Sequence, residues 1–283
     1  MNIADIKFSG IADEAGSSLQ TQIQAHRELG WKYLEIRNVD GEQLTDLSDQ
    51  KFDKICAQLE LANLKVSCFA SGIANWATKV SDDFHLSLDT LERAFKRMQR
   101  LETRYIRVMS YPNDGLSNDA WRDEVVRRFR EMAARAQAAD RVLVVENCDG
   151  WASTSPENYA KFFDLVDSPN VRAVYDTGNP ASHGFDNTWN WYQAAKPHLE
   201  YIHIKAHSLG ENAQHTWPDV GESCIEETLR DQLQSGYNGF VSIEPHLQSV
   251  AHQGKVISDE NAAFQTYVEY GQRLMKLIEK IKA

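Results

Sequence analysis

Short runs of apolar residues, each bounded by turn-forming residues, recur eight times along the chain and predict eight β-strands. Their starts lie 27 to 40 residues apart, which leaves room for a helix in every interval. The predicted strands are Ile6–Ser9, Tyr33–Arg37, Lys65–Ala70, Tyr105–Ser110, Val142–Glu146, Val171–Asp176, Tyr201–Lys205 and Val241–Glu244.

The segments between the strands carry apolar residues at helical spacing. In the first interval Leu19 and Ile23 recur on one face, and Gly30 follows as a C-terminal cap. In the fifth, Ser155 and Pro156 suit the N-cap and the first turn. The predicted helical stretches are 18–30, 52–63, 88–101, 121–139, 155–166, 188–195, 224–236 and 261–281.

Eight strands alternating with eight helices indicate parallel crossovers throughout, and their closed arrangement is an α/β fold, the (β/α)8 TIM barrel. We expect a single domain over residues 1–283, because no linker or low-complexity tract interrupts the pattern. A doubly wound open sheet is the alternative. The first strand is followed by FSGIADEAGSS, which holds neither a G-x-G-x-x-G motif nor a phosphate-binding loop.

Four consecutive predicted strands each carry a residue that can bind a metal ion, at or near their ends. These residues are Glu146, Asp176, His203 and Glu244, separated by 30, 27 and 41 positions. No local motif brings together residues so far apart, but barrel closure places the carboxyl ends of all strands on one rim. Side-chain alternation puts Val142 and Val144 on the face of Glu146, and Val174 on the face of Asp176, with the ionisable group at the top of each strand.

Three carboxylates converging at one barrel mouth would repel each other unless a cation lay among them. Three oxygen donors and one imidazole form a fairly hard site, which favours Mn²⁺ or Mg²⁺ and also accommodates Co²⁺ or Zn²⁺. The alternative is that the four residues are separate partners of salt bridges or helix caps. We expect one divalent metal ion as the cofactor.

Five segments and the eight-strand spacing carry a resemblance to a known group. They are GWKYLEIR, VVEN, YDTGN, HIK and VGESCIEETLRDQLQSGYNGFVSIEP. Together they resemble the xylose isomerase-like barrel superfamily of sugar isomerases and epimerases over nearly the whole chain. The resemblance implies that the four strand-end residues bind one divalent ion, and that Glu146 and Glu244 also act as the catalytic acid/base pair.

Such a site suits a sugar isomerase or epimerase that works on a ketose or polyol through a metal-stabilised enediolate. A dehydratase that expels water from a keto-inositol or dehydroshikimate-like substrate would form the same intermediate, and the sequence does not separate the two. Related endonucleases carry histidines on strands three and four, which read KVSCFASG and YIRVMSY here. A sugar-binding barrel without catalysis is the remaining alternative.

Further candidates for substrate binding lie beside the predicted cluster. Asn179 stands where many members of the superfamily carry histidine, and an amide donates and accepts hydrogen bonds but carries no proton. Lys205 and Arg107 are placed to reach substrate oxygens, and Glu35 and Arg37 share a face that also reaches the rim or forms a buried ion pair. His183, His207 and His246 lie in loops, where a solvated histidine is the common case.

Composition narrows the range of partners. The formal net charge is −11, from 41 acidic and 30 basic residues, and it opposes attraction to nucleic acid or to an anionic membrane. Four cysteines without a C-x-x-C pair indicate reduced thiols. No leader-like or membrane-spanning segment is evident. We therefore expect a cytoplasmic enzyme with a small sugar or polyol substrate, and a homo-oligomer is compatible with the sequence.

Overall fold

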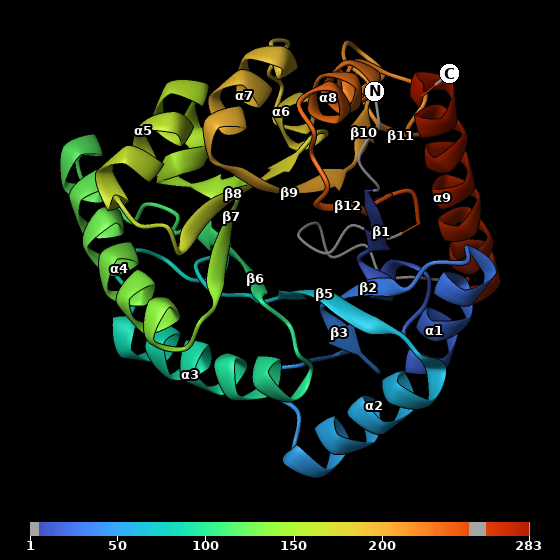
Figure 1. Cartoon of the computed structure of the whole chain (residues 1–283). Coiled ribbons are helices and arrows are strands. Elements are labelled where there is room, and N and C mark those ends of the chain that lie inside the picture. The colour runs from blue at the N-terminus through green and yellow to red at the C-terminus, as the bar shows by residue number, and fades with distance from the viewer. Residues whose placement is uncertain (1–5, 249–258, 283) are drawn as a thin grey trace.

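The computed structural model describes residues 6–248 and 259–282, so both ends of the domain expected over 1–283 lie outside it. Eight parallel strands stand in the centre with helices around them (Figure 1). The order in the sheet is β1-β12-β9-β8-β7-β6-β5-β2. The strands are β1 (Lys7–Gly10), β2 (Tyr33–Ile36), β5 (Lys65–Ala70), β6 (Tyr105–Ser110), β7 (Val142–Gly150), β8 (Val171–Asp176), β9 (Leu199–Ile204) and β12 (Phe240–Ile243).

The two outer strands of this sheet, β1 and β2, meet at a parallel bridge between Ile11 and Glu35. The sheet therefore curls back on itself as a nearly closed barrel. This arrangement confirms the predicted (β/α)8 TIM barrel, and the doubly wound open sheet was wrong.

Strand boundaries differ from the predicted ones mainly at the rim. β7 continues past Glu146 because Gly150 pairs with Ser110 of β6 after a register shift. β9 and β12 end one residue before Lys205 and Glu244, so these two side chains follow their strands directly.

The helices begin where the sequence provides side-chain caps. Ser18, Ser48, Asp83, Ser117 and Ser155 each accept a backbone N–H from the first turn of their helix. The longer helices are α1 (Leu19–Glu28), α2 (Asp49–Ala62), α3 (Phe84–Arg100), α4 (Asn118–Ala138), α5 (Pro156–Val166), α7 (Thr188–Ala195), α8 (Ile225–Gln234) and α9 (Glu260–Lys282). A four-residue helix, α6 (Asn179–Ser182), follows β8.

Two hydrophobic layers hold the barrel together. Apolar faces of the helices pack on the outside of the sheet; in α3 the buried residues include Leu88, Leu91 and Phe95, at helical spacing. Inside the barrel, Val144 and Val174 belong to a small separate cluster with Tyr201. This inner cluster forms an apolar floor, and the polar strand-end residues lie above it.

Two short antiparallel hairpins decorate the rim. β3 (Asn38–Val39) pairs with β4 (Glu42–Gln43), and β10 (Ala206–His207) pairs with β11 (His215–Thr216). The β3–β4 turn places Asp40 and Gly41 at φ 53° and 78°, the conformation that an Asp-Gly turn favours. The sequence analysis missed both hairpins, because two-residue strands leave no periodic pattern.

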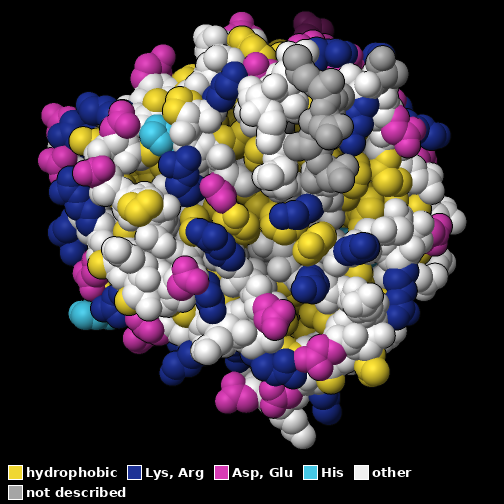
Figure 2. Space-filling model, in the orientation of Figure 1, with side chains coloured by type: hydrophobic (Ala, Val, Ile, Leu, Met, Phe, Trp, Pro, Cys, Tyr) yellow, Lys and Arg dark blue, Asp and Glu magenta, His cyan; other side chains and the backbone are white. Residues whose placement is uncertain are grey.

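Acidic and basic side chains intermingle on the face shown in Figure 2, with apolar patches between them. Within the described residues, no helix combines the length and apolar character needed to cross a membrane.

Buried His26 makes the stability of the fold depend on pH. It lies in α1, fully buried, with Nδ1 2.8 Å from the Gln22 carbonyl and Nε2 3.2 Å from the Tyr267 hydroxyl. Burial lowers the pKa of His26 from 6.5 to about 4, against the opposing effect of its backbone hydrogen bonds. Between about pH 6.5 and pH 4, His26 therefore binds a proton in the unfolded chain but stays neutral in the folded chain.

We expect the free energy of unfolding to fall as the pH drops from 6.5 towards 4, and His26 alone to contribute about 2.5 kcal/mol of this loss at pH 4.5. Urea unfolding of wild type and His26→Gln at pH 7.5 and 4.5 measures this change in the free energy of unfolding. The variant should lose less stability than wild type on acidification. Equal losses in the two proteins would contradict the assignment to His26.

Candidate active site

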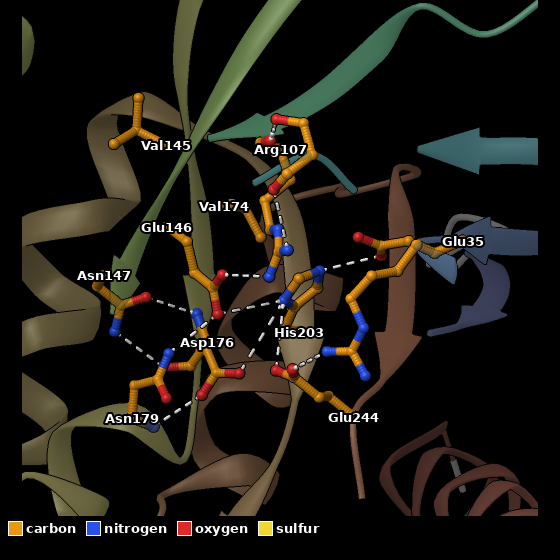
Figure 3. Close-up of polar contacts among 12 residues, drawn as sticks. Glu35, Arg107, Val145, Glu146, Asn147, Val174, Asp176, Asn179, His203 and Glu244 are labelled. Atoms are coloured by element: carbon orange, nitrogen blue, oxygen red, sulfur yellow. Dashed lines mark hydrogen bonds and ion pairs between the residues drawn. The ribbon is translucent and has the colours of Figure 1, made fainter. Parts of the chain in front are cut away.

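The barrel register brings the four predicted strand-end residues together. Asp176 pairs directly with His203 across β8 and β9, and Glu146 pairs with Val174 across β7 and β8. The backbone N–H of Glu244 donates to the carbonyl of Ile204, 3.0 Å away, which continues the β12–β9 pairing to the rim. All four side chains point into the same space (Figure 3).

The four side chains form a compact, buried cluster centred on His203. One ligand atom from each residue lies within 4.8 Å of those of the other three. His203 Nδ1 lies 3.6 Å from Glu146 Oε1, 4.0 Å from Asp176 Oδ2 and 3.9 Å from Glu244 Oε2. Ligands that surround one ion at about 2.1 Å stand about 3–4 Å from each other, so this spacing fits a single metal ion.

Two atoms of the cluster lack the hydrogen bond that burial normally requires. Among the described residues, His203 Nδ1 and Asp176 Oδ2 are buried and form no hydrogen bond, although Lys205 Nζ lies 3.2 Å from Asp176 Oδ2 as an ion pair. Both atoms face the centre of the cluster. Buried atoms without a hydrogen bond, at the meeting point of three carboxylates and an imidazole, fit the ligand atoms of a divalent metal ion.

Glu35 supports the imidazole from the opposite side. Its Oε2 lies 3.0 Å from His203 Nε2 and accepts a hydrogen bond from the Ser242 hydroxyl at 2.8 Å. A proton on Nε2, shared with Glu35, leaves the lone pair of Nδ1 directed at the carboxylates. Glu35, expected at the rim as a substrate contact, is therefore placed behind His203 and is fully buried.

We expect Glu35→Gln to weaken divalent-metal affinity about tenfold, because a neutral amide supports the imidazole less well than a carboxylate. A metal titration followed by calorimetry measures this change. Glu200→Gln, another glutamate of the barrel strands but bonded to Tyr105, serves as the matched control. Unchanged affinity in Glu35→Gln would show that Glu35 does not support the ligand.

Asp176 is oriented by the turn that follows β8. Its Oδ1 accepts the backbone N–H groups of Gly178 and Asn179 at 2.9 and 2.7 Å, which leaves Oδ2 for the cluster. The Asn147 amide brackets the backbone of Asp176 with two further hydrogen bonds. A Cβ on Gly178 would lie 2.6 Å from the Lys205 carbonyl, so only glycine fits in this turn.

The two glutamates are held in a similar way. Glu146 turns Oε1 towards His203, while its Oε2 accepts a hydrogen bond from Arg107 at 3.0 Å. Glu244 turns Oε2 towards His203, while its Oε1 lies 3.5 Å from Arg37. Each glutamate thus has one oxygen in the cluster and the other beside a guanidinium.

These neighbours set the ionisation of both glutamates. Burial alone would raise the pKa of Glu146, but Arg107 and then His203 outweigh it and lower the pKa to about 2. Burial is likewise outweighed at Glu244, where Lys205 is the largest opposing influence, and its pKa lies well below the usual range. Both glutamates are therefore carboxylates at neutral pH.

Asp176 behaves differently from the glutamates. Burial, reinforced by the charges of Glu244 and Glu146, raises the pKa of Asp176 to about 8, although Lys205 acts in the opposite direction. Lys205 Nζ lies 2.7 Å from Glu244 Oε2 and 3.2 Å from Asp176 Oδ2. A carboxyl group that is hard to ionise among protein charges alone would be stabilised as a carboxylate by a divalent cation.

The other predicted contacts also reach the cluster. Asn179 is buried and donates from Nδ2 to Glu146 Oε1 at 3.0 Å. Arg107 joins Glu146 to the Ser71 carbonyl, and Arg37 contacts Glu244. Their roles towards a substrate stay predictions.

Sequence reasoning missed a group of residues beside Glu244. Asp13 and Glu14 follow β1, and both contact Arg37 at 3.1 and 3.7 Å. Glu14 also accepts a hydrogen bond from the backbone N–H of His246 and lies 2.8 Å from its Nδ1. The segment ADEAG after the first strand carried the signal, since it places carboxylates at a strand end like those of the main cluster.

The expectation of solvated loop histidines was wrong in two cases. His246 is 3 % exposed and His207 is 8 % exposed, whereas His183 is exposed. The rings of His207, in β10, and of His246 both pack edge-on against His215 of β11.

A (β/α)8 barrel with three carboxylates and a histidine converging at the strand ends is a scaffold equipped to hold a divalent ion. Residues 23–267 match the family described as the xylose isomerase-like TIM barrel, and the chain belongs to this family. Comparison with curated proteins gives no match.

Solved structures with the same fold include a D-allulose 3-epimerase from Methylomonas sp. in complex with D-allulose, with 17% identity, coverage of 96% of this chain and 97% of that one, and a TM-score of 0.72. A probable 3-DHS dehydratase from Bacillus anthracis has 16% identity, coverage of 95% and 99%, and a TM-score of 0.72. A xylose isomerase-like barrel protein from Mycobacterium smegmatis in complex with magnesium has 16% identity, coverage of 97% and 98%, and a TM-score of 0.70. At these identities the likeness shows the fold.

Proposed function

We propose that the protein is a divalent-metal-dependent sugar isomerase or epimerase that acts on a ketose or polyol. The observation that carries the proposal is the cluster in which His203 Nδ1 faces three carboxylates, two of them glutamates whose second oxygens lie beside guanidinium groups. The ion would be held by Glu146, Asp176, His203 and Glu244.

The donor set favours Mn²⁺ or Mg²⁺, and the Mycobacterium smegmatis protein of the same fold, solved in complex with magnesium, supports a divalent ion. When bound, the ion supplies Lewis acidity that stabilises negative charge on substrate oxygens. Lys205 Nζ, at the edge of the cluster, would stabilise the same developing charge by hydrogen bonding.

Glu146 and Glu244 act as the acid/base pair. They lie on strands separated by β8 and β9, so they approach a bound sugar from different sides. One carboxylate removes the proton from the carbon next to a carbonyl. In an epimerisation the other glutamate, after taking up a proton from solvent, returns that proton to the opposite face; in an isomerisation the first glutamate returns its own proton to the neighbouring carbon. A substrate oxygen that draws Arg107 away from Glu146 would make that carboxylate a stronger base.

The charges around the mouth favour a neutral substrate. Three cations of the site are each paired with its carboxylates: Arg37, Arg107 and Lys205. The carboxylates outnumber them: Asp13, Glu14, Glu35, Glu146, Asp176 and Glu244. Even with a divalent ion the site is not positive, so a phosphorylated sugar would be repelled.

A dehydratase acting on a keto-polyol is the second candidate. Expulsion of a hydroxyl group needs a general acid, and His246 offers one: its Nδ1 is bonded to Glu14, and its Nε2 lies 3.8 Å from Glu244. The D-allulose 3-epimerase and the probable 3-DHS dehydratase of the same fold support the first and the second candidate, respectively.

The test is to incubate the Mn²⁺- or Mg²⁺-loaded protein with ketoses, keto-inositols and keto-acids and to follow new species by NMR and mass spectrometry. We expect a product of unchanged mass from a non-phosphorylated ketose. Loss of one water would establish the dehydratase instead. No turnover of any compound, together with undiminished sugar binding in metal-free protein, would favour a sugar-binding barrel.

A further inference from the structure

A second cavity lies on the same rim, outside the metal cluster. It has a volume of about 420 Å³, within the range of small-molecule sites. The loops after β2 and β5 and the first turns of α3 form its walls, so it opens at the carboxyl end of the barrel. The polar residues that matter for its chemistry are Gln43, Thr45, Asp46, Asn75 and Thr78.

Two side-chain amides from different loops converge over a residue without a side chain. A Cβ on Gly72 would lie 3.1 Å from Gln43 Oε1 and 3.3 Å from Asn75 Nδ2. Asn75 Oδ1 accepts the N–H of Ala77, but Asn75 Nδ2 and the Gln43 amide make no hydrogen bond to another described residue. The absence of a side chain at Gly72 thus lets the two amides approach the same point of the wall.

Two of the polar residues in the wall are largely buried. Thr45 is 3 % exposed, and its hydroxyl forms no hydrogen bond within the described residues; Asn75 is 8 % exposed. A hydrogen-bonding occupant of the cavity would satisfy the Thr45 hydroxyl and Asn75 Nδ2.

The wall selects the chemical class of that occupant. Amides, hydroxyls and carboxylates alternate with the apolar side chains Ile73 and Leu86. Among the described residues that line the cavity there is no lysine, arginine or histidine, so nothing there compensates an anion. A neutral ring with several hydroxyl groups and an apolar C–H face matches this wall.

We propose that this cavity binds a neutral sugar unit, separately from the metal cluster. The side chain of Arg107 connects the two sites. It donates one hydrogen bond to the carbonyl of Ser71, next to Gly72, and another to Glu146 of the cluster. The sugar is either the non-reacting part of a larger substrate, which rests on the proposed function, or a free sugar that binds independently.

The experiment is an NMR titration of the ¹⁵N-labelled full chain with D-glucose, D-fructose and maltose. Each titration is carried out once in chelator-treated buffer without divalent metal and once with Mg²⁺ added. We expect saturable shifts of the Gly72 N–H and of the Gln43 and Asn75 side-chain amides. Asn75→Ala, which removes a donor, and Gly72→Ala, which crowds the two amides, should each weaken the affinity about fivefold or more. Gln50→Ala, an exposed amide of α2 outside the cavity, is the matched control and should bind as wild type.

The two sources of the sugar give different patterns. Maltose binding more tightly than glucose, with shifts at both Gly72 and His203, identifies part of a substrate. Shifts confined to the surroundings of Gly72, equal for glucose and maltose, identify an independent sugar. The proposal would be overturned if none of the three sugars gave a saturable shift, or if wild type and both cavity variants bound with equal affinity. Shifts of the same amides with Ca²⁺ added in place of a sugar, and none with the sugars, would also overturn it. Since the readout needs neither metal nor turnover, it can fail or succeed independently of the proposed function.

Discussion

Replacing Asp176 with alanine is expected to abolish tight binding of a divalent ion. Wild-type protein should bind about one ion per chain, because the four ligand atoms lie within 4.8 Å of one another around a single space. At a metal concentration a thousandfold above the dissociation constant, the bound ion would stabilise the fold by about 4 kcal/mol. That corresponds to a rise in melting temperature of about 8 °C, which Asp176→Ala should lose. Elemental analysis and thermal melts with Mn²⁺, Mg²⁺, Co²⁺ and Zn²⁺ measure both effects.

A second variant separates ligation from folding. Asp176→Asn can keep the hydrogen bonds from Gly178 and Asn179 through its Oδ1, while an amide nitrogen replaces the oxygen that faces His203. It should fold like the metal-free wild type and still fail to bind the ion. Asp149→Asn changes a carboxylate of the same rim outside the cluster and should bind as wild type. Full metal content in both Asp176 variants would show that the ion does not bind at this cluster.

Replacing either glutamate with glutamine should lower turnover by about 10²–10⁴-fold, the usual contribution of a general acid or base. The two changes should also differ from each other. If each glutamate exchanges the proton on one face of the substrate carbon, Glu146→Gln should stop one epimer from taking up deuterium from D₂O. The other epimer should still take up deuterium. Glu244→Gln should show the reverse pattern.

Metal content must be measured beside the rate, because both glutamates also contact the ion site. Glu157→Gln, in the exposed first turn of α5, is the control for a surface glutamate and should be fully active. A metal-replete variant at Glu146 or Glu244 that kept wild-type turnover would remove that residue from the acid/base role.

Most of the barrel could be read from the chain because each βα unit carries its own local signal. The strand Val171–Asp176 was predicted with the boundaries that the structure has, and Ser155 and Pro156 start α5 as expected. The four strand-end residues were found by the same reasoning, since a parallel barrel sends every strand end to one rim.

The role of Glu35 could not be read in this way. Alternation along β2 indicated the face of its side chain, but its contact with His203 depends on closure between β1 and β2, across 168 residues of sequence. The same holds for Glu14, whose partner His246 lies at the opposite end of the chain, 232 residues away. The wall of the second cavity likewise combines Gln43 and Asn75 from separate loops.

The sequence by itself determined the order and type of the elements and which residues stand at the strand ends, because hydrophobic periodicity, helix caps and turn residues act over a few positions. Only the tertiary structure decided which atom of each strand-end side chain faces the centre of the cluster and which residue lies behind that side chain. Arg107, Arg37 and Glu35 orient Glu146, Glu244 and His203 through contacts between distant strands. Such contacts depend on the register and closure of the barrel, which no local pattern encodes.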